Sequence, residues 1–191
     1  MQDVRILNLE KSFGDKHVLS GVSLDIPFGS RIALMAPSGA GKTTLLRILL
    51  GLEKADAGRV EGMPARVAAV FQEDRLCPWL SVAENVRLAS PRAKGEEVAK
   101  ILAPLGLAGE ENTPASELSG GMARRTAIAR ALVFGGDMLI LDEPFRGLDE
   151  QTRARTAACI DEVARGKTLL LVTHDEREAE LLSARVLRDL L

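Results

Sequence analysis

The stretch from residue 35 to residue 44 reads MAPSGAGKTT. It nearly matches the pattern G-x-x-x-x-G-K-[S/T], in which backbone N–H groups of a turn and the following helix start converge on phosphate oxygens. Lys42 supplies a positive charge to the same oxygens, and the Thr43 hydroxyl is placed to ligate Mg²⁺. Gly39 and Gly41 let the backbone curl closely without side-chain clashes. Ala36 stands where the pattern has a glycine.

The alanine weakens the match to the pattern more than it weakens the chemistry. It would strain the turn only if its φ had to be positive, at a cost of about 1 kcal/mol. The following Pro37 restricts Ala36 toward extended geometry, in which alanine is tolerated. A chance Gly/Ser turn is the alternative, and the apolar run before the loop and the helical run after it disfavour it. The loop residues expected to bind a nucleotide are Pro37, Ser38, Gly39, Ala40, Gly41, Lys42, Thr43 and Thr44.

A second group of chemically able residues lies in DMLILDEP, residues 137–144. Asp142 ends an apolar run, where a carboxylate can hold Mg²⁺ directly or through water. Glu143 can accept a proton from an attacking water or orient it. Taken alone, an ordinary strand end explains the pair equally well. Together with the phosphate loop, the two carboxylates indicate metal-assisted phosphate hydrolysis.

A third motif, LSGGMARR at residues 118–125, resembles a helix start. Ser119 is a suitable cap, and Gly120 and Gly121 leave the helix N-terminus unobstructed. An open helix N-terminus binds anions. For this stretch alone, a simple helix start is the preferred interpretation.

The elements that must position these residues alternate between strand and helix. Short apolar runs predict strands at 3–9, 17–26, 31–35, 65–71, 137–142 and 167–174. Helices are expected at 43–52 and 148–166, the second capped by Asp149 with Gly166 at its C′ position. This alternation predicts an α/β fold with a mainly parallel sheet.

The middle of the chain has helical patterns and no obvious strand. Ser81 and Glu84 form a capping-box signature, and 90–109 contains a polar loop followed by an amphipathic helix. We therefore expect one domain, with an α/β core at about 1–72 and 135–191 and a small helical insert at about 73–134.

Composition is that of an ordinary globular protein, with 46% hydrophobic and 27% charged residues among 191. The net charge of −2 argues against a nucleic-acid partner, which usually requires a basic excess. Cys77 and Cys159 have no metal-binding spacing and fit reduced thiols of a cytosolic protein. No signal pattern or bilayer-length apolar run occurs, so any work at a membrane would be that of a peripheral subunit.

The motifs follow one another in a characteristic order: the loop at 36–44, VFQEDRL, LSGGMARR, DMLILDEP, RGLDE and LVTHD. In this order the chain resembles the ATP-binding subunit of ABC transporters over essentially its whole length. The resemblance implies a P-loop NTPase core with N-terminal antiparallel strands. It further implies ATP and Mg²⁺ as cofactors, ATP hydrolysis, a homodimer and membrane-spanning permease subunits. The protein would be cytoplasmic and peripheral on the inner face of the cell membrane.

The resemblance also assigns roles to single positions. Phe13 matches the aromatic residue that stacks on adenine, with a small-core phenylalanine as the alternative. Gln72 matches the glutamine that touches Mg²⁺ and the attacking water and links the site to the membrane partner. His174 matches the histidine that contacts the γ-phosphate. Ser119 and Gly121 match the motif that binds the γ-phosphate held by the other subunit, and Asp149 matches the aspartate at the dimer seam.

The chain departs from the family pattern at a few positions. Met122 follows the LSGG motif where glutamine is commoner, and Ser30 stands where glutamate is frequent. The chain ends 17 residues beyond His174, so we expect no regulatory tail domain. PWLSVAENV, residues 78–86, resembles importer subunits that serve nitrate, sulfonate or taurine, and Trp79 and Leu80 would lie near the groove for the partner's cytoplasmic helix. For Trp79, packing within the insert is an equally good interpretation.

Two other function classes remain to be weighed against a transport ATPase. A soluble ABC protein acting on DNA would need a long coiled-coil insert, which this sequence does not have. The ribosomal type usually carries two ATPase units in one chain, whereas this sequence contains the motifs of one. A phosphate-loop kinase would not explain LSGG or the placement of His174.

Overall fold

The computed structural model describes residues 2–37 and 39–188, and its chain begins with an antiparallel sheet. The strands β1 (Val4–Phe13) and β2 (Lys16–Ile26) form a hairpin in which Phe13 pairs with Lys16. The strand β4 (Ala57–Glu61) joins the other edge of β1, which gives the order β2-β1-β4. Phe13 thus ends a strand at the hairpin tip.

A second sheet of five parallel strands forms the centre of the molecule. Its strands are β3 (Arg31–Leu34), β5 (Val67–Val70), β6 (Met138–Asp142), β7 (Thr168–Val172) and β8 (Arg185–Leu187). They lie in the order β5-β6-β7-β3-β8, and every neighbouring pair is parallel. The predicted α/β fold with a mainly parallel sheet and N-terminal antiparallel strands is confirmed.

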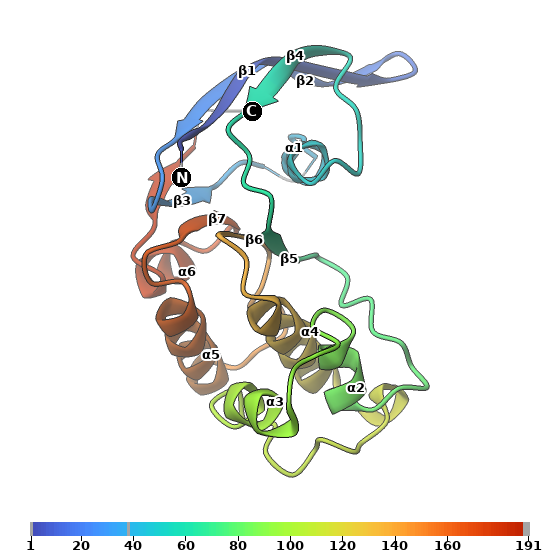
Figure 1. Ribbon diagram of the computed structural model, residues 1–191. Coiled ribbons are helices and arrows are strands. Elements are labelled where there is room, and N and C mark those ends of the chain that lie inside the picture. Colours follow the sequence, from blue (N-terminus) through green and yellow to red (C-terminus); the bar gives the residue numbers. More distant parts are fainter. Residues whose placement is uncertain (1, 38, 189–191) are drawn as a thin grey trace.

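Helices cover both faces of the parallel sheet (Figure 1). The helix α1 (Lys42–Leu49) lies between the two sheets, whereas α4 (Gly120–Phe134), α5 (Glu150–Val163) and the short α6 (Glu176–Leu181) lie on the opposite side.

Burial on both faces explains why the central strands are apolar at every position. Met138 and Ile140 of β6 pack with α1 and the antiparallel sheet. Leu139 and Leu141, which point the other way, pack with residues of α4 and α5. Because successive side chains of a strand point to opposite faces, each strand contributes to both cores.

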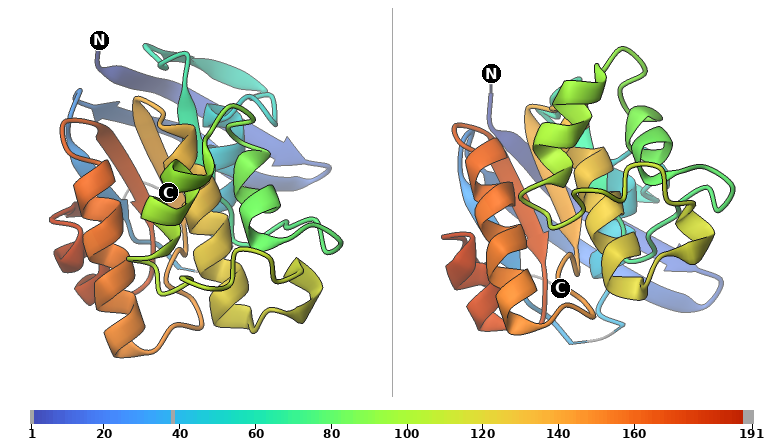
Figure 2. Two further views of the ribbon diagram at one scale, coloured as in Figure 1. Left: turned by 60° about the horizontal axis from the view of Figure 1, so that its bottom comes forward. Right: turned by 90° about the horizontal axis from the view of Figure 1, so that it is seen from below.

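The helical insert adds α2 (Val82–Arg87), α3 (Gly95–Leu102) and a 3₁₀ turn (Ala115–Glu117) beside α4 (Figure 2). The capping box is present: the Glu84 N–H donates to the Ser81 hydroxyl, and the Glu84 carboxylate accepts from the Ser81 N–H at 2.8 Å. No helix within 2–37 and 39–188 is both long and apolar enough to span a bilayer.

Four of the described elements escaped the sequence analysis, namely β4, the 3₁₀ turn at Ala115–Glu117, α6 and β8. The strand β4 is short, glycine-containing and exposed at most positions, so it shows no alternation of apolar and polar residues. The helix 150–163 ends earlier than expected, so Gly166, with its φ of 71°, lies beyond the C′ position. The boundaries proposed for the helical insert stay a prediction.

Candidate functional site

Strand register brings the sequence motifs to one edge of the parallel sheet. Leu34 of β3 and Asp142 of β6 both lie beside Val172 of β7. The segments that follow these three strands therefore leave the sheet side by side at its carboxyl edge. In open α/β sheets this edge is where ligands bind.

A cleft of about 650 Å³ opens at this edge, and we call it the central cleft. It gathers residues that lie up to 161 positions apart in the sequence, from Phe13 to His174. The sequence-predicted residues that line it are Phe13, Gly39, Gly41, Lys42, Thr43, Thr44, Gln72, Asp142, Glu143 and His174. Pro37 and Ala40 belong to the same loop without lining the cleft, and Ser38 lies outside the described residues.

The 36–44 loop has the turn that its glycines require. Gly41 caps α1 with a φ of 93°, and Gly39 has a φ of 82°. Ala36 does not have a positive φ, so alanine fits there without conformational strain. The Lys42 ammonium donates to the carbonyl of Ala36 and, at 2.8 Å, to that of Pro37, which holds its charge over the loop.

Thr43 and Asp142 face each other where the loop meets the end of β6. The Thr43 hydroxyl donates to the Asp142 carboxylate at 3.2 Å. Asp142 is only 3% exposed, and this burial raises the pKa of its carboxyl group. A hydroxyl and a carboxylate, with Gln72 lining the same cleft, are oxygen ligands of the kind that Mg²⁺ prefers. The residues present therefore fit a magnesium ion.

Glu143 and His174 form a pair at the mouth of the cleft. The His174 imidazole Nδ1 lies 3.0 Å from a Glu143 carboxylate oxygen, and this hydrogen bond raises the pKa of His174. The Glu143 backbone has a φ of 49°, a left-handed conformation rare for a residue with a side chain. Its N–H donates to the Val172 carbonyl at 2.9 Å, which ties the turn after β6 to β7.

The LSGG motif and Asp149 lie outside the central cleft. Ser119 caps α4 by accepting the Met122 N–H at 3.3 Å, and Asp149 caps α5 by accepting the Thr152 N–H at 2.9 Å. The two helix starts are neighbours, because a Cβ at Gly121 would lie 3.5 Å from Leu148. Ser119, Gly120 and Asp149 are exposed. They lie on a surface outside this chain's own cleft.

Four residues at the site were missed by the sequence analysis. Lys16, Val18 and Arg146 also line the central cleft, and Arg124 is buried behind it. The sequence carries no local signal for them, because strand pairing and helix packing bring them to the site.

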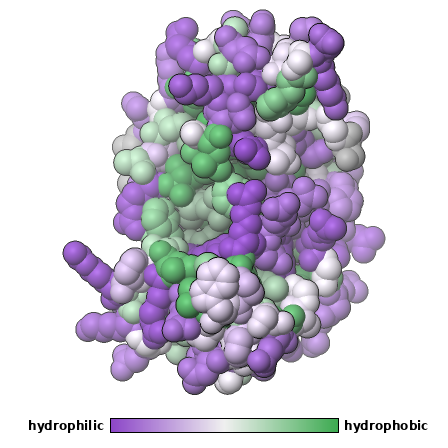
Figure 3. All heavy atoms as spheres, turned by 90° about the vertical axis from the view of Figure 1, so that its right-hand side faces the viewer, coloured by the Kyte–Doolittle hydropathy of each residue, from purple (hydrophilic) through white to green (hydrophobic). Residues whose placement is uncertain are grey.

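The exposed Trp79 lies on the segment that leads from Gln72 to α2. Its relative exposure is 78%, so the interpretation that it packs within the insert is wrong. On the face to the right in Figure 1, Figure 3 shows apolar side chains gathered in a hollow between the β-rich and helical parts. Leu52 and Leu88 are also half exposed.

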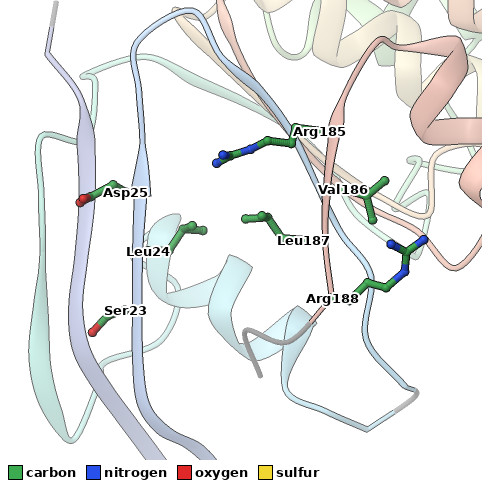
Figure 4. Close-up of a pocket in the computed structure, with 7 residues that line it drawn as sticks. All are labelled: Ser23, Leu24, Asp25, Arg185, Val186, Leu187 and Arg188. Atoms are coloured by element: carbon green, nitrogen blue, oxygen red, sulfur yellow. The ribbon is translucent and has the colours of Figure 1, made fainter.

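A second cleft, also of about 650 Å³, lies between β2 and the segment at β8. Leu24 and Leu187 point toward each other across it (Figure 4). None of the sequence-predicted site residues lines this cleft.

The sequence is similar to proteins with curated names. It is 46% identical over 188 residues to the aliphatic sulfonates import ATP-binding protein SsuB 2 of Rhodococcus jostii, an alignment covering 96% of this chain and 77% of that protein. It is 47% identical over 191 residues to SsuB 2 of Nocardia farcinica, covering 96% of this chain and 78% of the relative.

Solved structures of ABC proteins share this fold. A dimeric bacterial ABC transporter cassette matches with a TM-score of 0.86 and 29% identity, over 97% of this chain and 94% of that one. An ATP-bound bacterial Atm1-family ABC exporter matches with a TM-score of 0.89 and 25% identity, over 98% of this chain and 36% of that one. The family model described as ABC transporter matches residues 19–146. With the loop, the paired carboxylates and the LSGG helix start in place, the chain belongs to the ABC transporter family as an ATP-binding, ATP-hydrolysing subunit.

Proposed function

We propose that this protein hydrolyses ATP to power the import of a small solute through a separate membrane-spanning permease. The observation that carries the proposal is the central cleft, which joins the phosphate loop, Asp142, Glu143 and His174 in one place. The two SsuB relatives are named as import proteins for aliphatic sulfonates, which makes an organosulfonate our proposed solute class.

We assign the nucleotide to the cleft as follows. Phe13, which is 50% exposed at the hairpin tip, offers its ring to adenine. The loop N–H groups and Lys42 bind the phosphates. Thr43, Asp142 and Gln72 would hold Mg²⁺, which when bound neutralises charge on the phosphate oxygens.

For hydrolysis, Glu143 orients the attacking water and accepts its proton. His174, hydrogen-bonded to the Glu143 carboxylate, contacts the γ-phosphate and holds that carboxylate in place. The His174 side chain is 79% exposed, whereas that of Glu143 is 18% exposed. One chain alone therefore leaves this side of the phosphate uncovered.

A second copy would cover it. Ser119, Gly121 and Asp149 lie outside the chain's own cleft, at two adjacent helix starts. In a two-fold homodimer the helix start of one copy would lie over the phosphate of the other, so that two ATP molecules are buried. A related cassette has been solved as a dimer.

The permease would dock on the face that carries Trp79. The segment from Gln72, which lines the cleft, leads along the chain to this exposed tryptophan. A partner helix there would sense movements of Gln72. We accordingly place the protein in the cytoplasm, peripheral on the inner face of the membrane.

The test uses Glu143→Gln, with Glu180→Gln, an exposed carboxylate on α6, as the matched control. We expect Glu143→Gln to lower the ATPase rate at least about 100-fold while ATP still binds and drives dimer formation in analytical ultracentrifugation. The control should keep the wild-type rate. A Glu143→Gln protein that hydrolyses ATP at the wild-type rate would overturn the assigned chemistry. If Glu143→Gln forms no ATP-dependent dimer even in the presence of the permease, the proposed homodimer is refuted.

A further inference from the structure

The helix α4 sends an arginine into the interior behind the central cleft. Arg124 is 3% exposed, and its guanidinium group donates to two segments that are far apart in the sequence. Five of its acceptors are main-chain carbonyls. The acceptors are the carbonyls of Phe71, Gln72, Asp142, Glu143 and Pro144 and the carboxylate of Asp74.

On one side Arg124 holds the turn that carries the proposed base. Its Nη2 lies 2.6 Å from the carbonyl oxygens of both Asp142 and Glu143, and its Nε lies 3.1 Å from that of Pro144. On the other side its Nη1 lies 2.9 Å from the Asp74 carboxylate and also donates to the Phe71 carbonyl. One planar group thus spans the backbone of the proposed base and the backbone around Gln72.

Both segments contain a strained residue. Glu143 has a φ of 49° and Arg75 a φ of 48°, and such conformations persist only where the surroundings enforce them. The carbonyl of Glu143 is held by Arg124. The carbonyl of Arg75 is held at 2.8 Å by Arg130, also from α4. The helix that begins at the LSGG motif therefore anchors the carbonyl groups of both residues.

We propose that Arg124 is a positioning residue for ATP hydrolysis, which fixes the Glu143 carboxylate relative to Gln72 and passes movements of the 71–75 segment to Glu143. The inference rests on the function proposed above, in which Glu143 is the base. Only an arginine provides five donors in a rigid plane that reach both segments. A lysine keeps the positive charge beside Asp74, but its single nitrogen cannot reach the carbonyl groups of both segments.

The test compares Arg124→Lys and Asp74→Asn with Arg31→Gln. Arg31 is the control because it is a partly buried arginine that, like Arg124, donates to both a carboxylate and a main-chain carbonyl, those of Asp161 and Leu182. It lies at the amino end of β3, away from the cleft. Asp74 is part exposed, so Asp74→Asn weakens one anchor of Arg124, by replacing a charged acceptor with a neutral amide oxygen, with little risk to folding.

We expect Arg124→Lys to lower kcat about 10- to 100-fold, since a small misplacement of a reacting group has effects of that size. KM for ATP should stay within about threefold, because the loop and Phe13 are untouched. Asp74→Asn should lower kcat about three- to tenfold. Hydrogen exchange should rise in both the 71–75 and 142–146 segments of these variants, whereas Arg31→Gln should leave kcat and these segments unchanged.

The outcomes separate the inference from the function on which it rests. If Glu143→Gln is inactive but Arg124→Lys and Asp74→Asn both keep the wild-type kcat, the role of Arg124 is refuted and the proposed function stands. If Arg124→Lys, Asp74→Asn and Arg31→Gln all lose activity only in proportion to the amount of folded protein, Arg124 is structural and the inference is refuted. If Glu143→Gln hydrolyses ATP normally, the proposed function itself fails.

Discussion

The two glycines of the phosphate loop are predicted to differ sharply in their tolerance of a methyl group. Both have positive φ, 82° for Gly39 and 93° for Gly41. A Cβ at Gly41 would lie 2.7 Å from the Val18 carbonyl oxygen and 2.8 Å from a Leu19 methyl carbon of β2. Among the described residues outside its immediate neighbours, a Cβ at Gly39 would meet no atom within 4 Å.

These contacts set the expected magnitudes. A left-handed conformation costs a residue with a Cβ about 1–2 kcal/mol, which applies to both substitutions. Forcing a methyl group against a backbone oxygen adds about 1–3 kcal/mol, because β2 must move or the loop must open. We expect Gly39→Ala to lower the free energy of unfolding by about 1–2 kcal/mol and Gly41→Ala by about 2–5 kcal/mol.

Urea unfolding followed by circular dichroism, without nucleotide, measures both values. Gly109→Ala is the matched control, because Gly109 has a φ of 88°, open space around it and a position remote from the loop. It reports the conformational cost alone. Equal losses for Gly39→Ala and Gly41→Ala, or a larger loss for Gly39→Ala, would refute the reasoning that β2 supports the loop from behind.

Three further predictions concern other parts of the chain. The Lys11 ammonium lies 5.0 Å from the centroid of the Phe13 ring, which we assign to adenine, so Lys11→Met should weaken binding of a fluorescent ATP analogue about two- to fivefold. An unchanged affinity would contradict the idea that Lys11 supports the Phe13 ring. Burial raises the pKa of the Cys159 thiol to about 11, so a thiol reagent at mildly alkaline pH should modify the partly exposed Cys77 and reach Cys159 only on unfolding, and rapid reaction of both would contradict the packing. Bonds from Ser81 lower the pKa of the Glu84 carboxyl, so its stabilisation is complete above the ordinary carboxyl pKa and is lost as pH falls through the lowered value. The stability advantage of wild type over Glu84→Gln should therefore shrink between about pH 6 and pH 3 in thermal melts, and an advantage that grows in acid would contradict this sign.

The sequence predicted the site wherever a short local pattern implies a local geometry. The glycines and the lysine of the 36–44 loop lie between an apolar strand and a helix, and the structure has that order. Asp142 and Glu143 follow four apolar residues, and the structure ends a strand there. The helix caps at Ser81, Ser119 and Asp149 could also be predicted from the sequence, because capping depends on only a few successive residues.

The parts that escaped prediction depend on contacts between distant segments. Nothing in LSGGMARR distinguishes the buried Arg124 from the more exposed Arg125, because the groups that accept from Arg124 are contributed by segments far away in the sequence. Arg146 reaches the central cleft through a turn whose direction is set by β6 and β7. The strand β4 exists because β1 offers a free edge, not because its own residues favour a strand.

The protein contains one tryptophan and no tyrosine, and the tryptophan is Trp79, most of whose surface is open to water. Its intrinsic fluorescence therefore comes almost wholly from a single indole, which lies on the segment where we propose that the permease docks. An indole that passes from water into an apolar interface shifts its emission to shorter wavelength. Unlabelled wild-type protein is thus already a spectroscopic reporter. Once the spectrum of a candidate permease alone is subtracted from that of the mixture, a shift of the remaining emission to shorter wavelength would identify a permease that engages this face.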